Sequence, residues 1–533
     1  MRAMTLIPGS RIFWAVTLAA LVLMLLFLPR SPLPWLDEIF FASTSLSLVR
    51  GGTAVPTVLA AFPQTHRVDL FYGPVAFFLG SCDLRLFGLS LLGWRLLGFA
   101  GAIVLTFAAA WVSRCLDRSP TATAASAMLV VLSQGMGARA TSGRIDTVTV
   151  ALELLALGCG IRALQTWHNW RSQRMYAVGA GFLCGLAALS TPRSFPFLFG
   201  FFIALAIEIV LAKKQTWIAL GLVPAVSALL PIAWWTIRQG TDPVGWLRFV
   251  LAASRGDTVS VSPMLQGSWH LFDGPLVPRL SGLLAILLMF VVFGAAILTS
   301  RQQNETDRLD FAASGLRMAS ITVMVNYLTT LVVVARFWDY EVFVVPLVLP
   351  VLIPLSARVL RTGGRRTVHR LLVGSWLALA ILLVFIRAGK IAVWLASYQG
   401  RDPRPLLALV EGKIPKNSRV FGPDEYYFYA VESAGSHYLF VRAIAPNGLV
   451  SKLYEGPNWR RELTSNQFLY LIWPTNRNLP RDLALANLQL EASFTPSEGG
   501  FACCRWLGRD SGYPPTTLYR IISAPSSDSG AVP

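Results

Sequence analysis

The first 390 residues alternate between long apolar runs and short polar segments. A helix needs about 20 apolar residues to cross the hydrocarbon core of a bilayer, and many of these runs approach that length. The sequence therefore predicts an all-α polytopic membrane domain over residues 1–390. Its eleven predicted spans are 11–29, 93–113, 121–137, 147–165, 176–190, 195–212, 216–237, 279–299, 315–335, 339–357 and 371–388.

Charge placement sets the predicted orientation of these spans. If the N-terminus lies inside, every short inside loop is basic, as the positive-inside rule requires, and the odd number of spans leaves the chain beyond residue 391 outside. The apolar segment 71–79 is interpreted as re-entrant or interfacial, because a full crossing there would move the arginine-rich loop 358–370 outside. Two long exterior segments then remain, 30–92 and 238–278, and loops of such length are usually functional.

The chain changes character after residue 390. The segment 391–533 is polar, with turn signals between short strand-like runs and helical patterns, which is typical of a small α/β domain. Strands are expected at 419–421, 438–441, 468–473 and 517–522, and helices at 404–412 and 480–487. The sequence therefore predicts an extracytoplasmic α/β domain after the membrane domain.

Composition supports this division and excludes other classes. Hydrophobic residues make up 54% of the 533 residues and charged residues only 14%, against roughly a quarter in soluble domains. Most of the positive charge behind the net charge of +18 lies in short segments between apolar runs, and the sequence contains no platform of aromatic and basic residues that would indicate a nucleic-acid partner. The cysteines lack metal-ligand spacing, so the sequence predicts no metal site.

Acidic and basic residues recur where the chain faces the exterior. Asp37 and Glu38 follow the first span, and they fit a helix N-terminus as well as they fit a functional acidic pair. The same loop returns to the membrane through His66, Arg67 and Asp69, followed by Tyr72. Any one of these residues alone would suit a solvated loop edge.

Further exterior charges lie at the ends of spans. Arg144 and Asp146 open the fourth span and could simply pair with each other, whereas Arg193 and Arg336, near Tyr340, could be interfacial residues that extend toward water. Taken together, arginines can bind phosphate in a bidentate manner and carboxylates can accept protons from hydroxyls. These exterior arginines and carboxylates together therefore indicate a site that binds a lipid-phosphate substrate and activates the hydroxyl of an alcohol.

The order of these features resembles that of the GT-C glycosyltransferases of the protein O-mannosyltransferase and lipid A aminoarabinose transferase type. Residues 11–390 carry the resemblance, through an acidic motif after the first span, a loop return rich in Pro and Tyr, an Arg-x-x-Asp-like motif opening a span, a cation after a Gly-rich span, and an Arg–Tyr element followed by spaced prolines. These motifs are Asp37-Glu38, His66–Pro74, Gly143–Asp146, Thr191–Arg193, and Arg336–Tyr340 with Pro346, Pro350 and Pro354. Two details differ: Asp69–Pro74 replaces a Lys/His-Pro-Pro-Leu return, and Arg193 replaces a common Lys.

The resemblance implies an inverting glycosyltransferase of the bacterial inner membrane that uses a polyprenyl-phosphate-linked sugar. Asp37 would be the base, Glu38 would orient the acceptor or support local structure, and Arg67, Arg144, Arg193 and Arg336 would bind the donor phosphate. His66, Asp69, Tyr72, Asp146 and Tyr340 would complete the site. The acceptor would be a lipid, glycan or protein, membrane lipids would surround the chain, and no cofactor is required, although the carboxylates would tolerate a divalent cation.

Two other functions fit part of the pattern. A transporter or flippase of an anionic lipid-linked sugar would also need exterior arginines, but it predicts internal repeats and mid-span charges, for which Glu153 and Glu208 are the main candidates. A receptor or scaffold accounts for neither the acidic pair nor the arginines.

Overall fold

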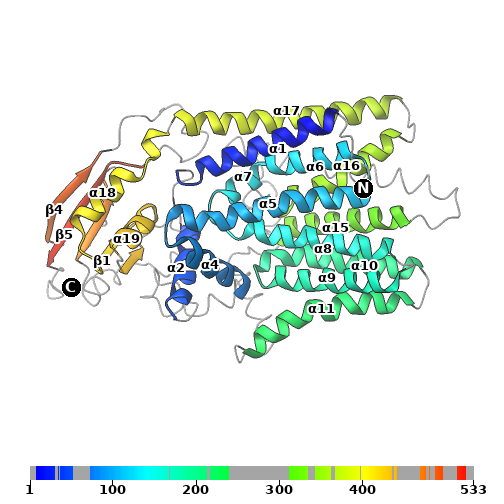
Figure 1. The fold of residues 1–533 in the computed structure, drawn as a ribbon, viewed down its shortest axis with the longest axis horizontal. Coiled ribbons are helices and arrows are strands. Elements are labelled where there is room, and N and C mark those ends of the chain that lie inside the picture. The colour runs from blue at the N-terminus through cyan, green and yellow to red at the C-terminus, as the bar shows by residue number, and fades with distance from the viewer. Residues whose placement is uncertain are drawn as a thin grey trace, which may run out of the picture. The chain divides into compact units, whose positions relative to one another are not determined.

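The structure of the protein is a computed structural model (Figure 1). The described residues are 8–51 without 31–33 and 35, 73–238 without 167–168 and 213–215, 311–333, 342–440 without 362–365, 397 and 435–436, 469–495 without 476–478 and 480–486, and 513–523. The predicted span 279–299 therefore lies outside the described residues.

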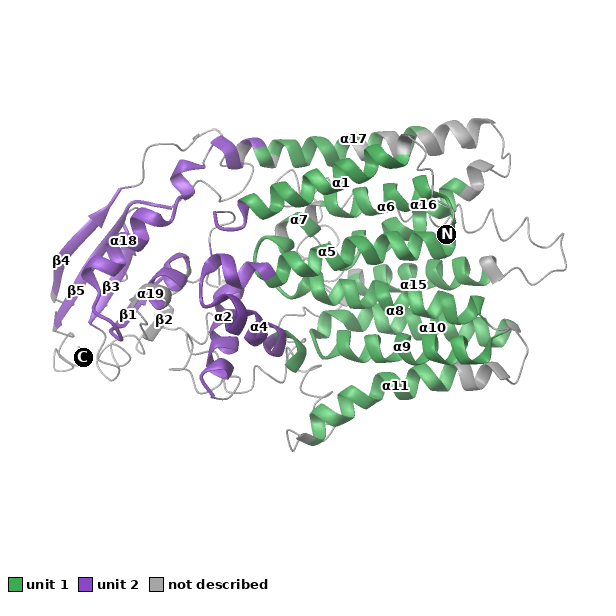
Figure 2. Ribbon diagram, in the orientation of Figure 1, with its two compact units in different colours: residues 1–26, 70–76, 97–391 green, residues 27–69, 77–96, 392–533 purple. Residues whose placement is uncertain are grey.

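The chain divides into two compact units (Figure 2). Unit 1 contains residues 1–26, 70–76 and 97–391. Unit 2 contains residues 27–69, 77–96 and 392–533. The last segment of unit 2 begins at Ala392, and unit 2 also includes residues 27–69 and 77–96, which overlap the predicted exterior loop 30–92.

Unit 1 is built from apolar helices, and their buried faces are largely aliphatic and small side chains. Those wholly or mostly in unit 1 are α1 (Pro8–Phe27), α5 (Leu91–Leu116), α6 (Pro120–Leu132), α7 (Gln134–Ala140), α8 (Asp146–Gln165), α9 (Trp170–Ala188), η3 (Pro192–Ser194), α10 (Phe195–Ala212), α11 (Thr216–Arg238), α15 (Phe311–Val333), α16 (Val345–Arg361) and α17 (Arg366–Ala396). The predicted span 121–137 is interrupted, because α6 ends at Leu132 and α7 begins at Gln134.

Several of these helices are long and apolar enough to cross a membrane. Among the described residues there are 4 such helices, or 5 if two segments that meet at 80° form one span. They are Ser10–Phe27, Leu91–Leu116, Asp146–Gln165 and Pro192–Leu211, and the bent pair is Ile381–Ala396 with Gln399–Lys413. The chain is thus a mostly helical membrane protein, while the total of eleven spans stays a prediction.

Unit 2 combines short helices with a sheet. Its helices are α2 (Leu36–Val49), most of α4 (Pro74–Phe87), η5 (Gln399–Arg401), α18 (Arg404–Lys413), η6 (Asp424–Tyr426) and α19 (Tyr427–Ala434). Residues 74–79 of the segment interpreted from sequence as re-entrant or interfacial form the first part of α4, which has 14 residues.

The sheet has five strands in the order β2-β1-β3-β5-β4. Strands β2, β1 and β3 run parallel, whereas β5 and β4 pair antiparallel. The strands are β1 (Arg419–Gly422), β2 (His437–Phe440), β3 (Tyr470–Pro474), β4 (Asn487–Phe494) and β5 (Thr516–Ser523). The sheet itself contributes a buried apolar core, made of Phe421 from β1, Leu471 and Trp473 from β3, and Ile521 from β5. Strands β1, β2, β3 and β5 thus lie at the four predicted runs. Strand β4 was not predicted, and its first residue, Asn487, was expected to end the helix 480–487.

Candidate functional site

Three arginines of unit 1 surround one carboxylate, and we name these four residues the arginine cluster. Arg144 Nε lies 2.8 Å from Asp146 Oδ2, Arg139 Nε lies 3.6 Å from the same atom, and Arg193 Nη1 lies 3.8 Å from Oδ1. Arg144 and Asp146 are buried, whereas the side chain of Arg193 is 20% exposed. The cluster carries three positive charges and one negative charge, so it favours an added anion.

Local structure brings these residues together. Asp146 is the first residue of α8, where a carboxylate is stabilised by the helix dipole. Thr147 Oγ1 donates a hydrogen bond of 2.8 Å to the Gly98 carbonyl oxygen, which fixes the start of α8 against α5. Arg193 lies in the 3-10 turn η3, whose first turn is capped by the Thr191 side chain.

Residues 73–75, where the described part of the chain resumes after Gly51, also contact this part of unit 1. The Val75 amide donates to the Leu189 carbonyl oxygen at 3.3 Å. A Cβ atom at Gly73 would lie only 1.9 Å from that oxygen, and Gly73 has a φ of +25°, so the position requires glycine. The Gly73-Pro74 turn therefore lies against the chain four residues before Arg193.

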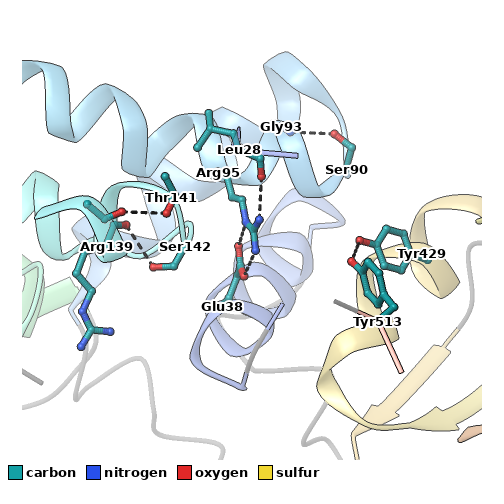
Figure 3. Close-up of polar contacts among 11 residues, drawn as sticks. Leu28, Glu38, Ser90, Gly93, Arg95, Arg139, Thr141, Ser142, Tyr429 and Tyr513 are labelled. Atoms are coloured by element: carbon teal, nitrogen blue, oxygen red, sulfur yellow. Dashed lines mark hydrogen bonds and ion pairs between the residues drawn. The ribbon is translucent and has the colours of Figure 1, made fainter. Parts of the chain in front are cut away.

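The two adjacent carboxylates of α2 differ in their environments. Arg95 donates from Nε to Glu38 Oε1 at 2.7 Å and from Nη2 to Oε2 at 2.9 Å (Figure 3). Its Nη1 donates to the Leu28 carbonyl oxygen at 2.8 Å. The Glu38 and Arg95 side chains are 0% exposed, whereas Asp37 is only partly buried. Asp37 is thus the more accessible carboxylate.

Burial raises the pKa of the Glu38 carboxyl to about 6, while the charge and hydrogen bonds of Arg95 act in the opposite direction. The carboxylate is therefore mostly ionised at pH 7. Near the ion pair, Tyr429 and Tyr513 share a buried hydrogen bond, which links α19 to the chain just before β5 (Figure 3). The Glu38–Arg95 ion pair thus joins the start of α2 to the start of α5 within unit 2.

Sequence reasoning did not identify Arg95 as a partner of Glu38. The position of Arg95 near the start of an apolar span could have revealed this pair, because an ionisable side chain at such a position usually has a specific partner. Arg139 was visible beside the Arg144 motif but was not counted among the phosphate ligands. Position along the chain alone did not reveal that it shares Asp146 with Arg193.

Other candidates fall outside the described residues. They are His66, Arg67, Asp69, Tyr72, Arg336 and Tyr340. Within the described part of the chain, no group of three or more His, Cys, Asp or Glu residues could hold a metal ion.

The two mid-span carboxylates also differ. Glu208 accepts a bidentate pair of hydrogen bonds from Arg317, so its charge is compensated. Glu153 is 0% exposed, and neither of its carboxyl oxygens has a hydrogen-bond partner among the described residues. Only Glu153 thus keeps the character of an uncompensated mid-span acid.

The fold of the chain is similar to that of one protein of known structure, ArnT. ArnT from Cupriavidus metallidurans bound to undecaprenyl phosphate is 14% identical, with a TM-score of 0.57 over 97% of this chain and 98% of that chain. The two chains share a fold. The apo state of the same ArnT gives 14% identity and a TM-score of 0.54, over 96% and 97% of the two chains. No protein-family model matches the sequence, and a search of curated proteins finds no match.

ArnT is a lipid A aminoarabinose transferase and a member of the GT-C superfamily. The resemblance to GT-C enzymes, stated above from short motifs, is thereby confirmed at the level of the fold. It extends over nearly the whole chain, including the segment after residue 390.

Proposed function

We propose that this protein is an inverting glycosyltransferase that moves a sugar from a polyprenyl-phosphate donor to an acceptor hydroxyl. The arginine cluster carries the proposal. Three guanidinium groups share one carboxylate at the end of a membrane helix, so a net charge of about two is left for a dianionic or monoanionic phosphate. Structural similarity to ArnT, which has been solved with undecaprenyl phosphate, supports the choice of a lipid phosphate.

The cluster would act most strongly on the leaving group. As the bond between the sugar and the phosphate breaks, negative charge develops on the phosphate, and preorganised cations stabilise that charge. Arg193 is the most exposed arginine of the cluster, which suits direct contact with the phosphate, while Arg144 and Arg139 hold the site around Asp146. Arg67 and Arg336 would add further positive charge.

Asp37 would act as the general base. It would accept the proton of the acceptor hydroxyl as that oxygen attacks the anomeric carbon, and the phosphate would leave from the opposite face with inversion. Glu38 is the adjacent carboxylate, but both its oxygens accept from Arg95, so it would hold α2 in place. His66, Asp69, Tyr72 and Tyr340 would contact sugar or acceptor, which would be a lipid, a glycan or a protein.

The proposed location is the bacterial inner membrane, with the segment after residue 391 on the exterior side. The basic loops support that orientation. A donor held in the outer leaflet would then meet an acceptor outside the cell.

Purified protein in nanodiscs, assayed against a panel of polyprenyl-phosphate sugars, tests the proposal. We expect release of free polyprenyl phosphate with sugar transfer, and loss of both in Arg193→Ala. A matched control is Arg118→Ala, which removes an exposed arginine from unit 1. Movement of an intact lipid-linked sugar between leaflets, without cleavage of its phosphate bond, would instead identify a flippase.

A further inference from the structure

One buried arginine of unit 1 lies outside the arginine cluster, and it forms no ion pair with any residue that the structure describes. The Arg387 side chain on α17 is 4% exposed. Within the described part of the chain, neither Nη1 nor Nη2 has a hydrogen-bond partner. An unpaired buried cation costs several kcal/mol, so a structure that retains one has a reason to supply an anion.

The site around Arg387 depends on a glycine of α7. A Cβ atom at Gly137 would lie 1.7 Å from Arg387 Nη1 and 2.1 Å from Cζ. Any larger residue at position 137 would thus displace the guanidinium, which lies directly on the α7 backbone. Met136 and Ala140 of α7 are fully buried, so the helix itself is held in place.

The surroundings of Arg387 indicate what kind of molecule could bring the anion. Along the same helix, Ile381, Val384, Phe385 and Leu395 are exposed large apolar side chains, as expected for a surface that faces lipid. A guanidinium on the same helix as such a surface can take a phosphate with two parallel N–H donors, while the lipid tails cover the apolar residues. An aqueous anion would gain nothing from that surface.

We propose that Arg387, seated on Gly137, forms a binding site for the phosphate of a membrane lipid at the crossing of α17 and α7. This site is additional to the donor-phosphate role assigned to Arg144 and Arg193, and it does not require that the protein be a transferase. The shared chemistry is a phosphate ester on an apolar anchor, which either a polyprenyl phosphate or a phosphoglycerolipid could supply.

Native mass spectrometry of the full chain tests the site, with titration of undecaprenyl phosphate, phosphatidylglycerol or inorganic phosphate. We expect Arg387→Met to weaken binding of one of the two lipids about ten- to a hundredfold, as for the loss of a charge-assisted hydrogen bond. Gly137→Ala should weaken the same lipid although Arg387 and its charge remain, because the new methyl group displaces the guanidinium. Alanine also favours a helix more than glycine, so this variant should fold.

Arg118→Met is the matched control, because it removes the same charge from an exposed position of unit 1. Its lipid binding should equal that of the wild type. The lipid that is lost in Arg387→Met identifies the source of the phosphate, and either lipid supports the site. The proposal would be overturned if the wild type, Arg387→Met and Gly137→Ala all bound both lipids equally well. It would also be overturned if Arg387→Met weakened the binding of inorganic phosphate but of neither lipid. Arg144→Ala, measured by sugar transfer, reports on the proposed function separately.

Discussion

Variants of the buried ion pair between Glu38 and Arg95 test whether Glu38 stabilises the fold or takes part in the chemistry. Both side chains are 0% exposed, and the carboxylate accepts two hydrogen bonds from one guanidinium. Glu38→Gln keeps the shape and one acceptor oxygen, but it leaves Arg95 charged and buried without a counter-charge. We therefore expect a loss of stability rather than a specific loss of chemistry.

The size of the effect follows from the burial. Removing one partner of a fully buried ion pair costs about 3–5 kcal/mol, because the other charge remains desolvated. Arg95 still donates to the Leu28 carbonyl oxygen, and Gln can accept one hydrogen bond, so we expect Glu38→Gln near the lower end. Arg95→Met should lie near the upper end at pH 8, since it leaves a carboxylate among apolar groups.

Arg95→Met also gives a pH dependence of known sign. Burial already raises the Glu38 pKa to about 6 in the wild type, and loss of Arg95 removes the factor that lowers it. A carboxyl whose folded pKa is raised stabilises the fold below its unfolded pKa, and that contribution is lost as pH rises through the folded value. Arg95→Met should therefore be closer to wild-type stability at pH 5 than at pH 8.

The assay is the midpoint of thermal unfolding in nanodiscs for the wild type, both single variants and the double variant Glu38→Met with Arg95→Met. The double variant should recover much of the loss, because replacing both charges leaves neither one unpaired. Transfer per folded molecule should stay near wild type in Glu38→Gln. A variant that melts like the wild type yet has lost its activity would refute the structural role and place Glu38 in the chemistry.

The remaining predictions concern the base, the phosphate site, a buried acid and the orientation. Asp37→Asn should fold and bind donor but lose roughly 10²–10⁴-fold in transfer rate, whereas a pure helix-capping role predicts an active Asn variant and damage only in Asp37→Ala; transfer and melting temperature separate the two. Arg144→Ala should weaken donor use about ten- to a hundredfold, and an unchanged activity per folded molecule would leave only its pairing with Asp146. Burial raises the pKa of Asp83 to about 7, so its stabilising contribution is lost as pH rises through that value, and Asp83→Asn should melt higher than wild type at pH 8 but not at pH 5. A reporter fused after Pro533 should be active only on the exterior side.

The sequence predicted the helical membrane domain because apolar runs of about 20 residues have few stable alternatives in a bilayer. It also located four of the five strands, β1, β2, β3 and β5, since Val, Ile, Tyr and Phe alternate there between turn residues. Strand β4 was not predicted, and Asn487, expected to end a helix, is its first residue. The pairing of β4 with β5 from Asn487 to Phe494 is a tertiary contact that the local pattern does not contain.

For the candidate site too, some features could be predicted from the sequence and others only from the structure. The sequence alone predicted Asp37, Glu38, Arg144, Asp146 and Arg193 as candidates, because charges next to apolar spans are costly without a role. It could not assign their partners. Arg95 lies 57 residues from Glu38, and Arg387 lies 250 positions from Gly137, so nothing local in the chain connects either pair.

Sequence thus determined which residues are charged at the membrane surface, since hydropathy and charge are properties of short segments. Tertiary structure decided which of these charges are compensated. The two carboxylates of one motif differ because the turn of α2 buries Glu38 against Arg95 and leaves Asp37 partly accessible. Three arginines, from the end of α7, from the turn before α8 and from η3, share Asp146 because these segments meet at the start of α8. Electrostatic energy depends on distance and burial, and both are set only when segments remote in sequence pack together.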